Sequence, residues 1–134
     1  MLADAADIVR LSLHVASATV WVGGQLTLAG LVPTLRQEAP ASLAPVARQF
    51  ARLSWPAFIV LLATGLWNIQ AVDPSKQGSA WRAVLVVKVV VVLLSGVGAA
   101  LHQRSSGPRG RAIWGATASL SALSALVLGV ALAG

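Results

Sequence analysis

Residues 84–94 read Val-Leu-Val-Val-Lys-Val-Val-Val-Val-Leu-Leu, an aliphatic run that only Lys88 interrupts. In a water-soluble protein such a run is typical of a buried strand. The apolar stretch that contains it is longer, however, and extends over residues 81–102. About 20 residues of helix cross the hydrocarbon core of a bilayer, so this length predicts a membrane-spanning helix.

The composition of the whole chain also indicates a membrane protein. Of its 134 residues, 57% are hydrophobic and 10% are charged, whereas a soluble domain carries about 25% charged residues. These values exclude a water-soluble fold, a disordered chain and a nucleic-acid-binding protein, although the formal net charge is +6. The basic surplus is expected to face the headgroups of a lipid bilayer. The chain has no cysteine, which excludes disulfides and thiolate ligands.

Apolar runs and breaker residues divide the chain into four predicted transmembrane helices. They cover residues 8–32, 55–72, 81–102 and 112–133. Residues 33–54 are rich in Pro, Arg and Ala and are expected to form a connection, with a short interfacial helix around residues 44–52. Residues 103–111 form the second long loop. The expected architecture is an all-α, integral membrane four-helix bundle made by a single domain, residues 1–134.

The distribution of arginine predicts the orientation of these helices. Connections 33–54 and 103–111 hold six arginines and one acidic residue, Glu38. The opposite side holds three basic residues and three aspartates, namely Arg10, Lys76, Arg82, Asp4, Asp7 and Asp73. Because basic residues concentrate in cytoplasmic loops, both connections are expected in the cytoplasm and both termini outside.

Polar side chains inside the spans are the candidate functional residues, because hydrocarbon makes such side chains costly. At helical spacing, His14, Trp21 and Gln25 share one face of the first span. In the second span, Thr64 and Asn68 are neighbours one turn apart. Each of these residues also has an ordinary structural use, since aromatic and amide side chains commonly pack or hydrogen-bond between membrane helices.

The third span carries a polar face of its own, with Lys88, Ser95 and His102 repeating every seven residues. At about 1.5 Å of rise per residue, His14, Asn68 and Lys88 lie roughly 6 to 11 Å below the outer surface. They are therefore expected to share one layer, with the imidazole and the ammonium facing one another. His102 lies near the cytoplasmic end, on the order of 20 Å from that layer, and is the weaker metal-ligand candidate.

The fourth span carries a stripe of small residues at steps of three and four. Its main members are Gly115, Ala118, Ala122, Ala125 and Gly129. Small side chains let a neighbouring backbone approach closely. The stripe predicts a packing face, either within the bundle or toward a second copy of the chain or a larger membrane complex.

Several motifs occur in a distinctive order along the first three spans. They are Leu-His-Val-Ala at residues 13–16, Val-Trp-Val-Gly-Gly at 20–24, Arg-Gln-Phe-Ala-Arg-Leu-Ser-Trp at 48–55, Thr-Gly-Leu-Trp-Asn at 64–68, and then Trp81, Leu85 and Lys88. This series resembles the copper-resistance D (CopD) membrane domain over about residues 10–104. A histidine in the first helix and a lysine in the third are also similar to the small four-helix membrane protoporphyrinogen oxidases of bacteria, which bind haem b. The resemblance implies a multi-pass protein of the bacterial inner membrane, with His14 as a candidate haem ligand and Lys88 as a functional lysine.

The leading hypothesis is that the chain binds haem b or a related tetrapyrrole near the outer leaflet, for a redox or haem-handling role. His14 would be the axial ligand, and Lys88 the partner of a propionate or substrate carboxylate, since a buried ammonium suits an anion. Asn68 and Gln25 would donate hydrogen bonds around the ligand, with Trp21 beside it. If the chain is an enzyme, this hypothesis makes it a haem-dependent membrane oxidoreductase.

Two further hypotheses stay open at this point. The first is copper ion transport or resistance, with His14 and, more weakly, His102 as ligands. The second is a structural accessory subunit that packs through the small-residue stripe of the fourth span.

Overall fold

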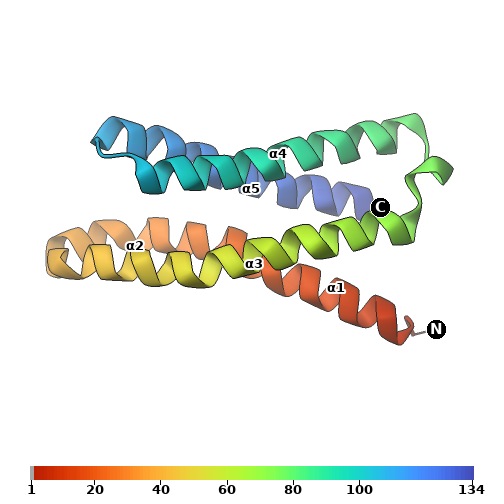
Figure 1. The fold of residues 1–134 in the computed structure, drawn as a ribbon, viewed down its shortest axis with the longest axis horizontal. Helices are drawn as coiled ribbons and strands as arrows, with labels where there is room; N and C mark the ends of the chain where they lie inside the picture. The colour runs from red at the N-terminus through yellow and green to blue at the C-terminus, as the bar shows by residue number, and fades with distance from the viewer. Residues whose placement is uncertain (1) are drawn as a thin grey trace. The chain divides into compact units, whose positions relative to one another are not determined.

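The computed structural model describes residues 2–134, which form long helices joined by short turns (Figure 1). Within these residues, four helical segments are long and apolar enough to cross a membrane: Ala5–Glu38, Pro40–Val72, Ser79–Arg104 and Pro108–Ala133. Each segment contains one of the four spans expected from the sequence. The prediction of an all-α chain with four helices able to cross a membrane is therefore confirmed for the described residues.

The chain divides into two compact units, Met1–Asp73 and Pro74–Gly134. The first unit contains α1 (Ala5–Ala18), the π-helix η1 (Thr19–Gly23), α2 (Gly24–Glu38), the 3₁₀ turn η2 (Pro40–Ser42) and α3 (Leu43–Val72). The second unit contains the 3₁₀ turn η3 (Pro74–Lys76), α4 (Ser79–Arg104) and α5 (Pro108–Ala133). Each unit is a helical hairpin.

The connection in the first unit is shorter than the sequence suggests. Of the expected connection 33–54, only residues 39–42 lie between α2 and α3, and the expected interfacial helix is the first part of α3. Pro33 lies inside α2, where a proline removes one backbone hydrogen bond without ending the helix, as is common in membrane helices. Pro45 falls in the first turn of α3, where backbone N–H groups have no helical partner anyway. The alanines, arginines and leucines around these prolines favour helix and outweigh them.

The other helix ends follow the breaker residues of the sequence. Asp73 ends α3 in the left-handed conformation, with φ of 54°, and Pro74 follows it. Pro108 begins α5, a position at which its fixed backbone angle suits a helix. Of the expected loop 103–111, residues 105–107 separate α4 from α5.

The core of the first hairpin is aromatic. The Trp21 ring lies 5.4 Å from the Trp55 ring and 4.3 Å from the Phe58 ring, measured between centroids, so that η1 packs directly on α3. Trp21 is 3% exposed. The π-helix carries this side chain, and the axis of α1 turns away from that of α2 at this segment in Figure 1. A π-helical segment is one of the recognised causes of such a bend.

The second hairpin is held together by small residues. The Ser95 hydroxyl, which is fully buried, donates a hydrogen bond to the Ala118 carbonyl at 2.9 Å. A Cβ atom added to Gly98 would come within 2.9 Å of the Ala118 nitrogen, so only glycine permits this approach of α4 to α5. At the other end, Trp81 Nε1 donates to the Leu132 carbonyl at 3.2 Å. The close contact of the two helices therefore depends on the small-residue stripe of α5.

Candidate ligand-binding site

His14 and Thr64 form the polar contact at the centre of the interface between α1 and α3. His14 Nδ1 lies 2.9 Å from Thr64 Oγ1. The Thr64 hydroxyl has one proton, and its best acceptor is the Val60 carbonyl at 2.7 Å, with the Leu61 carbonyl at 3.2 Å. The hydroxyl oxygen must then accept from His14, which places the imidazole proton on Nδ1. When the imidazole is neutral, its lone pair is therefore on Nε2, the nitrogen that could bind a metal.

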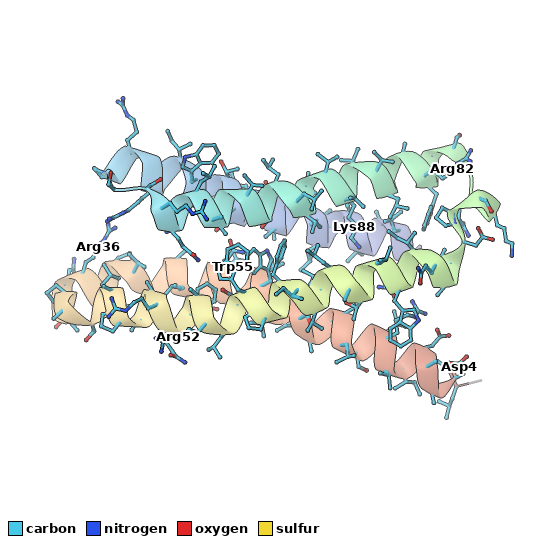
Figure 2. All side chains as sticks on the ribbon, in the orientation of Figure 1. Asp4, Arg36, Arg52, Trp55, Arg82 and Lys88 are labelled. Atoms are coloured by element: carbon cyan, nitrogen blue, oxygen red, sulfur yellow. The ribbon has the colours of Figure 1, made fainter. Side chains whose placement is uncertain are left out.

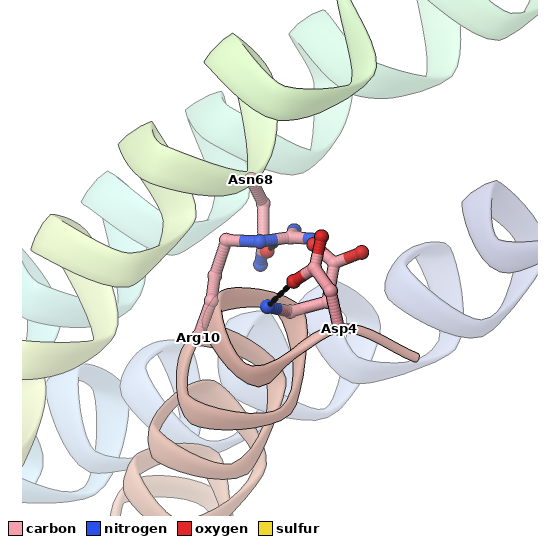
Figure 3. Close-up of polar contacts among 4 residues, drawn as sticks. Asp4, Arg10 and Asn68 are labelled. Carbon is pink, nitrogen blue, oxygen red and sulfur yellow. Dashed lines mark hydrogen bonds and ion pairs between the residues drawn. The ribbon is translucent and has the colours of Figure 1, made fainter. Parts of the chain in front are cut away.

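A second polar cluster lies on the same interface, nearer the N-terminus. The Arg10 guanidinium donates hydrogen bonds to the Asn68 amide oxygen and to the Asp7 carboxylate, and it forms an ion pair with Asp7 (Figure 3). Asp4 caps α1 by accepting from the backbone N–H of Asp7 at 2.8 Å. Arg10 is 7% exposed, although it carries a full charge. The sequence assigned Arg10 only to the charge balance outside the membrane and so missed it as a buried site residue.

The arginine also fixes the orientation of the Asn68 amide. A guanidinium has donors and no acceptor, so the amide group must present its oxygen to Arg10. The Asn68 Nδ2 group then lies on the side of the amide opposite to the oxygen that faces Arg10. The Asn68 amide oxygen is thus used within the hairpin, and the donor role expected for its Nδ2 group stays a prediction.

The first span is not a regular α-helix throughout the stretch that carries the residues expected on one of its faces. The π-helix lies between His14 and Gln25, so the regular spacing that grouped them does not hold through residues 19–23. Trp21 contacts the rings of Trp55 and Phe58, and Gln25 is half-buried on α2. His14 with Thr64, and Arg10 with Asn68, therefore form two polar contacts between α1 and α3, and Trp21 belongs to the aromatic core.

The expected polar face of the third span is confirmed in the second hairpin. Lys88 is half-buried on α4, with Nζ 3.0 Å from where a Cβ atom of Gly129 would lie (Figure 2). Ser95 bonds to Ala118, and His102 Nδ1 donates to the Arg111 carbonyl at 2.7 Å, since a carbonyl can only accept. All three side chains contact α5.

These contacts also account for the small-residue stripe of α5. Gly115 lies beside the His102 ring, and Gly129 leaves room for the Lys88 side chain. Ala118 lies against Gly98, and Ala122 and Ala125 are buried. The stripe thus packs on α4 within the hairpin, which is one of the two uses that the sequence left open.

The histidines are the candidate metal ligands, and they lie in different units, His14 in the first and His102 in the second. Between residues 2 and 134, no three His, Cys, Asp or Glu side chains come together as a metal-binding group. A haem iron takes most of its ligands from the porphyrin and needs only one or two from the protein. A single imidazole with its proton on Nδ1 fits that requirement.

No family model, curated protein or solved structure matches this chain. The resemblance to the CopD membrane domain and to the haem-binding oxidases thus stays a prediction from motifs. The candidate site is defined by the contacts of His14, Thr64, Arg10 and Asn68.

Proposed function

We propose that this chain is a membrane protein that binds haem b or a related tetrapyrrole, with His14 Nε2 as axial ligand to the iron. The observation that carries the proposal is the hydrogen bond between His14 Nδ1 and Thr64 Oγ1. Metal-binding histidines usually donate their second ring N–H to a neighbouring acceptor, which holds the ring and fixes its tautomer. Thr64 supplies that acceptor from α3.

The position of His14 supports a ligand inside the membrane. His14 is half-buried within a helix that is apolar enough to cross a bilayer. Ionisable residues in such helices are generally functional, because hydrocarbon does not solvate them. In the proposal the imidazole binds the haem iron, which an apolar side chain at this position could not do.

Lys88, in the second hairpin, is proposed by itself as a group that suits a carboxylate. Gly129 leaves space at its ammonium group, so that Lys88 lies along α5 without a clash. An ammonium attracts a porphyrin propionate and repels a free metal cation. This difference favours a tetrapyrrole over copper.

Bound haem would supply one-electron chemistry, while the protein would hold and orient it. We place the protein in the bacterial inner membrane, with both termini outside and the arginine-rich turns in the cytoplasm. Arg36, Arg48 and Arg52 are exposed on the helices that flank the turn between α2 and α3, and Figure 2 labels Arg36 and Arg52 there. This distribution supports the assignment through the preference of basic residues for the cytoplasmic side.

The experiment is an absorption titration of detergent-extracted protein with haem b. We expect a Soret band characteristic of a histidine-ligated haem in the wild type, and its loss in His14→Ala. His102→Ala is the matched control, since His102 is exposed and bonded to a loop carbonyl, and it should titrate like the wild type. Equal spectra for all three proteins would overturn the proposal, as would copper binding that depends on His14 without any haem binding.

A further inference from the structure

The buried guanidinium of Arg10 has more hydrogen-bond donors than the hairpin satisfies. A guanidinium carries five N–H groups. Hydrogen bonds among residues 2–134 use two of its N–H groups, one toward Asn68 and one toward Asp7. Arg10 is 7% exposed. Its remaining N–H groups are donors that a further acceptor can use.

Asn68 adds to the same donor surplus. Its amide oxygen accepts from Arg10, which leaves the Nδ2 group as a donor on the same side chain. The two side chains come from different helices, α1 and α3, and Arg10 and Asn68 converge as Figure 3 shows. Together they present N–H donors, which are the groups that a carboxylate binds best.

The donor cluster lies one helical turn from the proposed iron ligand. Arg10 precedes His14 by four residues on α1, a rise of about 6 Å. Asn68 follows Thr64 by four residues on α3, so the same step separates the two contacts on both helices. A tetrapyrrole whose iron binds His14 carries its propionates at the porphyrin edge, away from the iron.

Two acidic residues, Asp4 and Asp7, lie beside the cluster. Asp4 is committed to capping α1, and Asp7 occupies one edge of the guanidinium. The Asp7 side chain is 44% exposed, however, so water can solvate its carboxylate when it leaves the arginine. Asp7 therefore acts as a competitor that a better-placed carboxylate can displace.

We propose that Arg10 and Asn68 bind a carboxylate of the tetrapyrrole. This inference rests on the proposed function, and it assigns one propionate to Arg10. The arginine forms a charge-assisted, bidentate contact through its remaining N–H groups, and the Asn68 amide donates a further bond.

The test compares haem b with its dimethyl ester, in which both propionates are masked. We expect the wild type to prefer the free acid by about tenfold to a hundredfold, the range for hydrogen bonds to a charged group. Arg10→Gln should lose most of that preference. Arg82→Gln is the control, because Arg82 is exposed on α4, and it should keep the wild-type preference.

Asp7→Asn separates ligand binding from a structural role. Loss of the competing carboxylate should raise the affinity for the free acid several-fold, whereas a merely structural ion pair would give unchanged or weaker binding. Asp7→Asn also keeps the guanidinium, so it remains informative if Arg10→Gln does not fold. Equal wild-type binding of acid and ester, with a Soret band that still requires His14, would overturn this inference and the proposed role of Lys88, and would leave His14 standing as the proposed iron ligand. Absence of haem binding in the wild type would overturn both.

Discussion

His14 Nδ1 lies 2.9 Å from the hydroxyl oxygen of Thr64, and that hydroxyl donates its own proton to the Val60 carbonyl. The two bonds together fix which imidazole nitrogen carries the proton. The backbone of α3 thereby sets the tautomer of a side chain on α1.

Thr64→Val should weaken haem binding by about tenfold to a hundredfold, the usual effect of removing the group that orients a metal-binding histidine. Valine keeps the shape of threonine but cannot accept from Nδ1. Thr64→Ser is the matched control, since it retains the hydroxyl, and it should bind within a few-fold of the wild type. Titration with haem b measures both. Identical affinities for the valine and serine variants would contradict the assigned role of Thr64.

Gly98→Ala should destabilise the second hairpin by about 1–3 kcal/mol, the usual cost of overpacking. The added Cβ would lie 2.9 Å from the Ala118 nitrogen, and a backbone atom cannot move without shifting α5. Gly30→Ala is the control, because nothing lies within 4 Å of its Cβ position. Reversible unfolding in mixed detergent gives both free energies. A Gly98→Ala protein as stable as Gly30→Ala would show that the helices are not in close contact at Ala118.

Gly24→Ala should cost less than Gly98→Ala, although its Cβ would meet a neighbour at the shorter distance of 2.6 Å. That neighbour is the ring of Phe50, a side chain that can rotate, and an apolar groove of about 410 Å³ adjoins it between α2 and α3. The ring can therefore move aside. The same unfolding measurement orders the two variants, and the reverse order would contradict this account of the contacts.

Trp21→Leu should destabilise the first hairpin by roughly 1–3 kcal/mol, because the leucine leaves part of the space beside Trp55 and Phe58 unfilled. Trp67→Leu is the control, since Trp67 is 40% exposed, and it should have little effect on stability. A Soret maximum that shifts in Trp21→Leu without any loss of stability would instead favour the sequence-based expectation of Trp21 beside the ligand.

The sequence was sufficient for the helices but not for where they meet. Hydropathy located all four spans, because an apolar run of about 20 residues matches the length of helix that crosses the hydrocarbon core of a bilayer. The sequence overestimated the length of the first connection, because Pro33 and Pro45 were interpreted as helix breakers. In the structure only residues 39–42 lie between α2 and α3. A proline removes a single hydrogen bond, and the helix-forming residues around it decide the outcome.

The candidate site was only partly accessible from the sequence. Helical spacing placed Thr64 and Asn68 on one face, and the cost of a polar side chain in hydrocarbon singled out His14. Helical periodicity does not show, however, which residues of two neighbouring helices lie at the same height. The pairing of Arg10 with Asn68 and of His14 with Thr64 depends on that height. The π-helix at residues 19–23 was also missed, because spacing arguments assume a regular helix. The i, i+3 spacing of Asp7 and Arg10, at the start of an apolar run, was the available signal for the buried arginine.

The most direct test of the account is pulsed electron paramagnetic resonance on the haem-loaded protein grown with [15N]histidine. We predict a strong coupling between the iron and one 15N nucleus in the wild type, retained in His102→Ala and lost in His14→Ala. A coupling that survives in His14→Ala, or a haem complex with no 15N coupling at all, would contradict the assignment of His14 as the iron ligand.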